Sequence, residues 1–137
     1  MSRRSAPLHD SDYAALADFR AALRGFTAFS ETKAAEVGLT PRQHQALLAI
    51  RGKAPGQATI GYVAERLILK PHSASELVDR LDAMGLIIRQ TAAGDRRKTI
   101  LVLTNQANAL LAALSASHRE EIRRLKPLLL DLLNRFG

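Results

Sequence analysis

Residues 59–84, TIGYVAERLILKPHSASELVDRLDAM, contain two helical patterns joined by a tight connection at Ile68-Leu69-Lys70. Thr59 is a suitable N-cap for a short helix, and Pro71 opens a second helix at its first turn, where proline is well tolerated. The second helix ends at Gly85, and one of its faces is polar. In both helices apolar residues recur at helical spacing. They are Ile60, Val63, Ala64 and Leu67 in the first helix, and Ala74, Leu77, Val78, Leu81 and Met84 in the second. This pattern predicts a helix-turn-helix.

A capping sequence and a change of periodicity extend this prediction on both sides. Thr40-Pro41-Arg42-Gln43 combines an N-cap hydroxyl, a first-turn proline and a glutamine three residues on, which is a capping box for a preceding helix. Residues 86–91 and 98–103 are rich in branched side chains and predict two strands. Residues 92–97 join them as a turn with a basic tip. Three short helices followed by such a hairpin are the order of a winged helix.

A long helix is predicted before this unit. Asp10, Ser11 and Asp12 offer N-cap oxygens for a helix that begins near Tyr13. It ends at Val37-Gly38, with Gly38 in the left-handed cap position.

A second long apolar stripe follows the hairpin. Thr104 caps it, and its apolar positions run at spacings of three and four from Leu111 to Phe136. The stripe is longer than one small core needs, so it is able to face another chain. Pro127 predicts a break, with two helices meeting near Lys126. The fold class is therefore mainly α with a small β-hairpin.

Composition narrows the class of protein. The chain has 137 residues, a formal charge of +7 and no cysteine, and its length is that of a single domain. Residues 40–104 carry ten basic and five acidic side chains, whereas residues 1–39 carry five of each. Positive charge concentrated around the predicted winged helix points to nucleic acid as a partner. The lack of cysteine fits a reducing cytoplasm. No apolar run has the roughly 20 residues of a membrane span, and no secretory signal follows Met1-Ser2-Arg3-Arg4.

Catalytic and metal chemistry have no support in the sequence. It contains no Gly-rich phosphate loop, no serine nucleophile elbow and no evident pair of catalytic carboxylates. No two of its histidines show the i, i+3 or i, i+4 spacing of a helical metal site; they are His9, His44, His72 and His118. We therefore expect no enzyme activity, no catalytic residue, no cofactor and no metal.

The chemistry of a DNA-reading helix is present instead. The helix after the tight turn enters the major groove, and its first residues reach base edges. The predicted contacts there are Lys70, His72, Ser73, Ser75 and Arg80, although His72 could equally be plain surface. Glu76 and Asp79 would repel phosphate, so we expect them to face away from it or to pair with Arg80 or Arg66. Arg96, Arg97 and Lys98 suit a narrow minor groove, the alternative being a solvated hairpin tip.

The sequence resembles the multiple-antibiotic-resistance regulator (MarR) family of bacterial winged-helix repressors. The resemblance runs from Leu39 to Leu111. Its motifs are Leu39-Thr40-Pro41-Arg42-Gln43, residues 60–67, residues 75–81, Gly85-Leu86-Ile87-Ile88-Arg89, Asp95-Arg96-Arg97 and Leu103-Thr104. It implies a homodimer on a pseudo-palindromic operator, formed through the first and last helices. It also implies that Asp95 and Arg97 stabilise the wing tip and that Arg97 meets the minor groove. Ala107 stands where the family commonly has glycine.

The resemblance also implies an effector, because many members release DNA on binding a small, often phenolic, ligand. The family's pocket lies between the dimer helices and the winged helix. The side chains best placed for it are Tyr13, Phe19, Phe26, His44 and Leu47, whose alternative role is simply core and interface.

These observations predict one domain over residues 1–137. Residues 11–38 and 104–137 would form the dimerisation helices, and residues 39–103 the winged-helix DNA-binding unit. The predicted function is a cytoplasmic, sequence-specific and ligand-responsive repressor that acts as a homodimer. The alternative is a winged-helix protein-interaction module without specific DNA binding, since a fold does not fix function.

Overall fold

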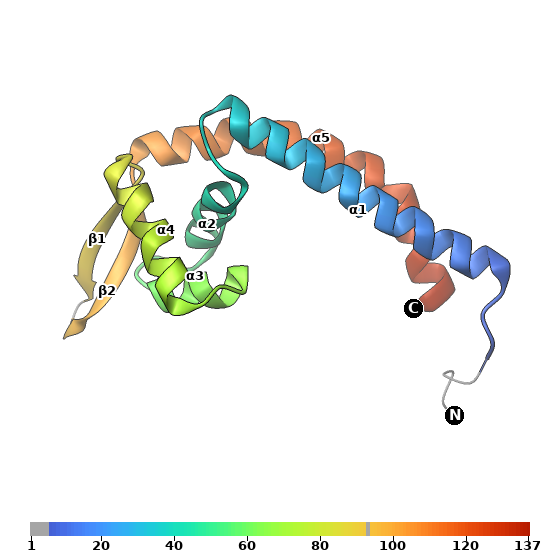
Figure 1. Cartoon of the computed structure of the whole chain (residues 1–137), viewed down its shortest axis with the longest axis horizontal. Helices are drawn as coiled ribbons and strands as arrows, with labels where there is room; N and C mark the ends of the chain where they lie inside the picture. The colour runs from blue at the N-terminus through green and yellow to red at the C-terminus, as the bar shows by residue number, and fades with distance from the viewer. Residues whose placement is uncertain (1–5, 93) are drawn as a thin grey trace. The chain divides into compact units, whose positions relative to one another are not determined.

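The computed structural model describes residues 6–92 and 94–137. Its elements, in chain order, are α1 (Asp10–Glu36), α2 (Pro41–Gly52), α3 (Ile60–Leu67), α4 (Pro71–Ala83), β1 (Ile87–Ala92), β2 (Asp95–Leu103) and α5 (Asn105–Phe136) (Figure 1). The predicted fold class, mainly α with a small β-hairpin in a winged helix, is confirmed. The chain divides into two compact units. The winged-helix unit is Glu31–Ala116, and the helix-pair unit comprises the described residues of Met1–Ser30 and Ser117–Gly137.

Side-chain caps fix the starts of the short helices in the winged-helix unit. The N–H of Gln43 donates to Thr40 Oγ1 at 3.2 Å, and the N–H of Thr40 donates to Gln43 Oε1 at 3.0 Å. The predicted capping box of α2 is therefore present. The N–H of Tyr62 donates to Thr59 Oγ1 at 3.1 Å, which confirms Thr59 as the cap of α3. α4 begins at Pro71 as predicted, without a side-chain cap.

The apolar faces of these helices meet the hairpin and the start of α5 in one core. Its largest fully buried side chains are Leu47, Val63, Val78, Leu81, Leu86 and Ile87. Full burial of one such side chain stabilises the fold by about 1.5–3 kcal/mol. Because α4 contributes Val78 and Leu81 to this core, its opposite, polar face is held outward.

The hairpin is longer than predicted. β1 and β2 pair antiparallel from Ile87↔Leu103 to Thr91↔Thr99, with an irregularity between Thr91 and Ala92. Ala92 was expected in the turn but belongs to β1, and residues 95–97 were expected there but belong to β2. Gly94 lies in the turn with a φ of +80°, a conformation that glycine adopts at low cost. Because a tight turn needs few residues, the polar residues after it are left to continue the backbone ladder.

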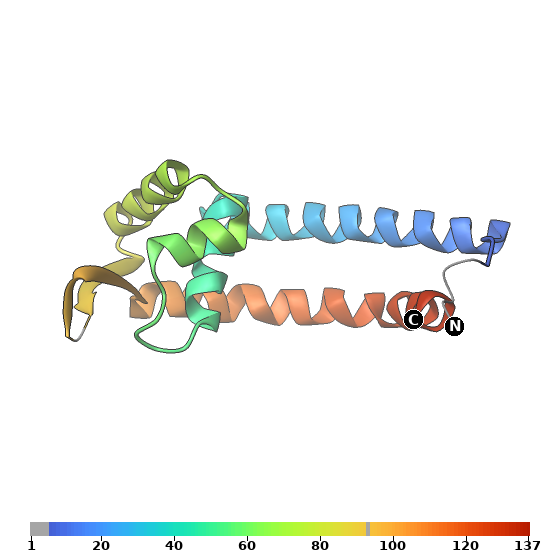
Figure 2. The same ribbon diagram turned by 90° about the horizontal axis from the view of Figure 1, so that it is seen from below.

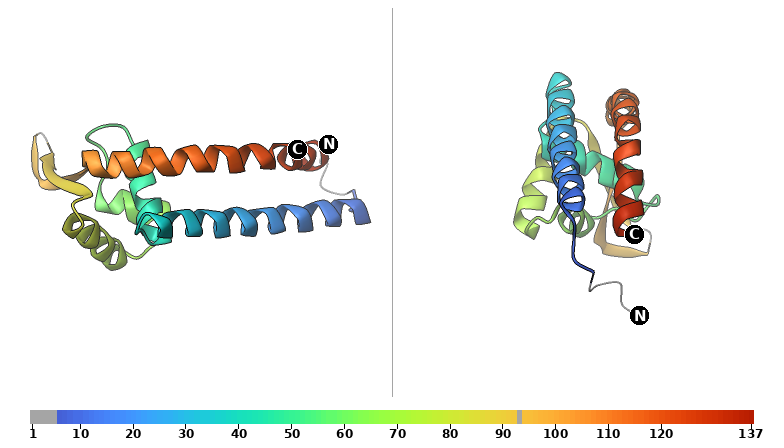
Figure 3. Two further views of the ribbon diagram at one scale, coloured as in Figure 1. Left: turned by 90° about the horizontal axis from the view of Figure 1, so that it is seen from above. Right: turned by 90° about the vertical axis from the view of Figure 1, so that its right-hand side faces the viewer.

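α1 and α5 run alongside each other in opposite directions within the helix-pair unit (Figures 2 and 3). Arg135 Nη1 lies 3.5 Å from Asp12 Oδ1, and Arg135 Nε donates to Asp131 Oδ2 at 2.9 Å. The hydrogen bond to Asp131 raises the pKa of Arg135. Farther along, His118 Nε2 is 2.9 Å from Ser30 Oγ, and the rings of Phe26 and Phe29 meet the His118 ring edge-on.

The ends of α1 correct one prediction and confirm another. The helix begins at Asp10, three residues before Tyr13. The N–H of His9 donates to Asp12 Oδ2 at 3.0 Å, so Asp12 caps from inside the first turn rather than preceding it. Gly38 has a φ of +81°, as its predicted cap role requires.

The prediction that Pro127 splits the last helical region into two helices is wrong. α5 is one helix from Asn105 to Phe136 with Pro127 inside it. Proline removes one N–H and displaces one carbonyl, but the turns on either side keep their bonds, so the helix bends instead of ending. Figures 1 and 2 show its last turns bent away from the preceding ones. None of the helices in the described part of the chain has the length and apolar character needed to cross a bilayer.

Candidate nucleic-acid interface

The first turn of α4 presents hydrogen-bond donors to solvent. Pro71 has no N–H, and the first helical bond runs from Ala74 N–H to Lys70 O at 3.0 Å. The N–H groups of His72 and Ser73 therefore have no intrahelical partner, and no described side chain caps them. Lys70 is exposed beside them. Free N–H groups at the positive end of a helix dipole favour phosphate or another anion.

A cavity of about 270 Å³ lies beside this turn. Its lining residues come from the start of α2, from the turn before α4 and from α4 itself, and include Arg42, Ser73, Glu76 and Arg80. Ser73 and Arg80 were predicted as contacts, whereas Arg42 was missed. The sequence did contain a signal for Arg42. It lies within the capping box Thr40-Pro41-Arg42-Gln43, which places this basic side chain in the first turn of α2.

The acidic residues of α4 have partners other than those expected. His72 Nε2 lies 3.1 Å from Glu76 Oε1, one helical turn away. Asp79 is paired with Arg89 of β1, whose Nε also lies 3.5 Å from Asp82 Oδ2. The alternative that they pair with Arg80 or Arg66 is therefore wrong, and the alternative that they face away from phosphate stays a prediction. Arg89 instead neutralises carboxylates on α4 and ties the hairpin to that helix, a role that sequence spacing did not show because the contact spans two elements.

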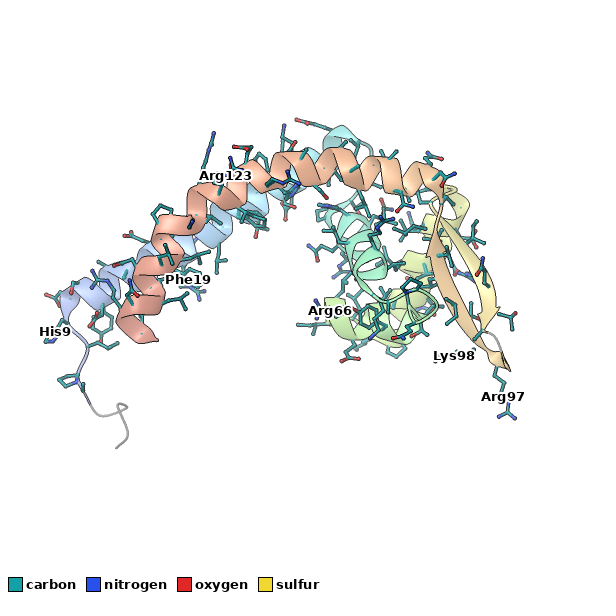
Figure 4. All side chains as sticks on the ribbon, turned by 180° about the vertical axis from the view of Figure 1, so that it is seen from behind. His9, Phe19, Arg66, Arg97, Lys98 and Arg123 are labelled. Carbon is teal, nitrogen blue, oxygen red and sulfur yellow. The ribbon has the colours of Figure 1, made fainter. Side chains whose placement is uncertain are left out.

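The free end of the hairpin is basic. Arg97 and Lys98 are exposed on β2, and Figure 4 shows both near that end, with Arg97 projecting beyond it. Neighbouring strand residues point to opposite faces, so the two cations cover both sides of the ribbon. Asp95 and Arg96 belong to the same strand, and their side chains lie outside the described part of the structure.

Sequence comparison finds a family model that matches the middle of the chain. The sequence model of the MarR family matches residues 37–98, from the residue after α1 into β2. These residues are therefore similar to the MarR family. The matched segment contains all the predicted contacts on α4 and the hairpin. A search among curated proteins finds no match.

Solved MarR-family structures share the fold over most of the chain. The MarR family transcription regulator SP03579 is 26% identical, with a TM-score of 0.73 over 86% of this chain and 77% of that one. AbsC from Streptomyces coelicolor is 21% identical, with a TM-score of 0.68 over 93% of this chain and 84% of the AbsC chain. MepR from Staphylococcus aureus, solved as a DNA complex, is 21% identical, with a TM-score of 0.68 over 88% of this chain and 85% of the MepR chain. The MarR fold therefore extends beyond the matched segment into α1 and α5.

The predicted effector residues are divided between the two units. Tyr13 is 59% exposed on α1, and Phe19 and Phe26 are half-buried in the helix-pair unit. His44 and Leu47 of α2 are buried in the winged-helix unit. Their role in binding an effector stays a prediction.

Proposed function

We propose that this protein is a sequence-specific DNA-binding transcription regulator. The observation that carries the proposal is the arrangement of one folded unit. The uncapped first turn of α4 and the basic end of the hairpin are attached to the same core, in the segment that holds the excess positive charge. The match of residues 37–98 to the MarR family model supports it, as does the likeness to MepR, which was solved with DNA.

The first half of α4 would read bases in the major groove. Small polar and basic side chains suit base edges, and the free N–H groups suit a neighbouring phosphate. Residues in these roles are Lys70, His72, Ser73, Ser75 and Arg80, with Arg42 added as a phosphate contact. Glu76 and Asp79, acidic residues on this helix, are the best support for the alternative of a protein-interaction module. Each has a basic partner, Glu76 in His72 and Asp79 in Arg89, and this supports the DNA-binding role.

The hairpin would enter the flanking minor groove. Narrow minor grooves have a strongly negative potential that attracts arginine. Arg96, Arg97 and Lys98 would supply the positive charge, and Asp95 would stabilise the tip.

The protein would form a homodimer through residues 11–38 and 104–137 as dimerisation helices, with residues 39–103 as the DNA-binding unit. Its support is apolar surface left exposed on α1 and α5, at Tyr13, Leu16, Leu23, Ile122, Leu129, Leu130, Leu133 and Phe136. Exposed apolar patches of this kind mark interfaces. A symmetric dimer would place two α4 helices about 34 Å apart, one turn of DNA.

The finer role proposed is that of a cytoplasmic repressor released by a small aromatic effector. Tyr13, Phe19, Phe26, His44 and Leu47 are its proposed contacts. Titration of a protein–operator complex with phenolic compounds would test this part separately, through loss of bound DNA.

Removing the Arg89 bridge should weaken DNA binding through charge. In Arg89→Met, Asp79 and Asp82 would face phosphates unneutralised, and we expect a loss of operator affinity of about tenfold. The triple change Arg89→Met, Asp79→Asn, Asp82→Asn should recover most of it, as measured by fluorescence anisotropy. Stability should change little, by about 1 kcal/mol or less, because the bridge is exposed. Equal affinities for wild type and Arg89→Met would contradict this role.

The proposed function is tested by selection from random duplex DNA with the full chain at two salt concentrations, followed by sequencing. An enriched inverted repeat with half-sites one turn apart, bound more weakly at higher salt, would support a sequence-specific dimer. Salt-sensitive binding without enrichment would contradict sequence-specific recognition by this protein as purified and favour the interaction module.

A further inference from the structure

The turn between α3 and α4 contains an unusual backbone conformation. Ile68 has φ 55° and ψ 51°, and among the described residues it is the non-glycine residue with a positive φ. This left-handed conformation ends α3, because it lets Leu69 N–H donate to Ala64 O at 2.8 Å. Isoleucine is a poor residue for it, since a branched Cβ crowds the backbone in the left-handed region, where glycine or asparagine fits better.

Burial of the Ile68 side chain does not offset the cost of this backbone conformation. It is 93% exposed, whereas Leu67 and Leu69 on either side are partly buried against the core. Neither the backbone nor the core of the free winged-helix unit therefore favours isoleucine here. Strained residues of this kind cluster at functional sites.

The charges around Ile68 indicate what would cover it. Arg66 and Lys70, two residues before and after it, are both exposed, and Lys70 is the N-cap of α4. The last turn of α3 also contains one acidic residue, Glu65, directly before Arg66. A DNA strand alternates anionic phosphates with apolar deoxyribose faces. An apolar side chain between two cations matches that alternation.

We propose that Ile68 packs against a deoxyribose of the DNA backbone beside the site read by α4, with Arg66 and Lys70 on the adjoining phosphates. This inference rests on the proposed function and adds a positioning contact to it. A sugar contact carries no base information, so it would contribute equally on any sequence. It is uncharged, so it would leave the salt dependence of binding unchanged.

The test compares the full-length wild type with Ile68→Asn and Ile68→Val by fluorescence anisotropy, on the selected duplex and on a random one. Asparagine accepts the left-handed conformation but removes the apolar contact, and valine keeps a branched apolar group. We expect Ile68→Asn to bind both duplexes at least about fivefold more weakly, with the same slope of affinity against salt. Its melting temperature should equal or exceed that of the wild type, because strain is relieved. Ile68→Val should stay within about twofold of wild type.

Leu48→Gln is the matched control, because Leu48 is another exposed apolar residue of the winged-helix unit, 44% exposed on α2. Its DNA affinity should equal that of the wild type. Unchanged affinity in Ile68→Asn, or a loss accompanied by a lower melting temperature, would overturn the inference while wild-type binding upheld the proposed function. A loss confined to sites with one particular base would also overturn it, in favour of a base contact. A wild type that binds neither duplex would overturn both.

Discussion

A protein carrying Ile122→Glu and Leu129→Glu is expected to be monomeric and to lose nearly all operator affinity. Ile122 and Leu129 are seven residues apart on α5, so they share one face, and both are exposed in the single chain. If a second copy covers them, each contributes about 1.5 kcal/mol or more, and symmetry doubles the number to four side chains. The dimer should then weaken by about 6 kcal/mol, roughly four orders of magnitude. Sedimentation velocity would measure the assembly state.

Arg124→Glu is the control for this pair. It also adds negative charge to α5, but two residues from Ile122 and therefore on the opposite side of the helix. It should remain a dimer. Circular dichroism should show that the double variant keeps its helices. A double variant that stays dimeric at micromolar concentration would show that α5 does not form the interface.

The wing arginines have the second largest expected effect. Arg96→Ala with Arg97→Ala should lower operator affinity by about 100-fold or more, because a dimer would lose four cations from two minor grooves. The slope of log affinity against log salt should also become shallower. Both would be measured by anisotropy titration at several salt concentrations. The melting temperature should hardly change, since Arg97 is exposed and the core lies elsewhere.

Arg124→Ala is the control and is compared with Arg97→Ala alone, because it removes one positive charge from an exposed position on the side of α5 opposite Ile122. It should keep wild-type affinity and salt slope. If the two single variants lose affinity equally, net charge rather than a hairpin contact governs binding.

Local signals in the sequence predicted the winged-helix unit well. Thr40, Thr59 and Pro71 act within one turn of their own position, so the starts of α2, α3 and α4 could be read directly. The predicted apolar positions Ala74, Leu77, Val78 and Leu81 likewise became core, whereas Met84 is exposed.

Features that depend on contacts between elements were missed. Arg89 lies ten residues from Asp79, and only the fold brings β1 against α4. The outcome at Pro127 depended on whether the neighbouring turns hold the helix, which periodicity does not show. The length of the hairpin depended on a backbone ladder that forms irrespective of side-chain charge.

The bridge from Arg89 to Asp79 and Asp82 has a consequence for the geometry of any operator. It joins the hairpin to α4 at the surface, while Leu81 and Ile87 join them in the core, so the two contact elements move as one body. The distance along DNA between the bases read by α4 and the flanking minor groove is then fixed. Inserting one base pair between these two sites would shift the flanking minor groove by about 3.4 Å and rotate it by about 34°. A rigid winged-helix unit could not then contact both sites at once. Operators should therefore vary in base sequence but not in this spacing.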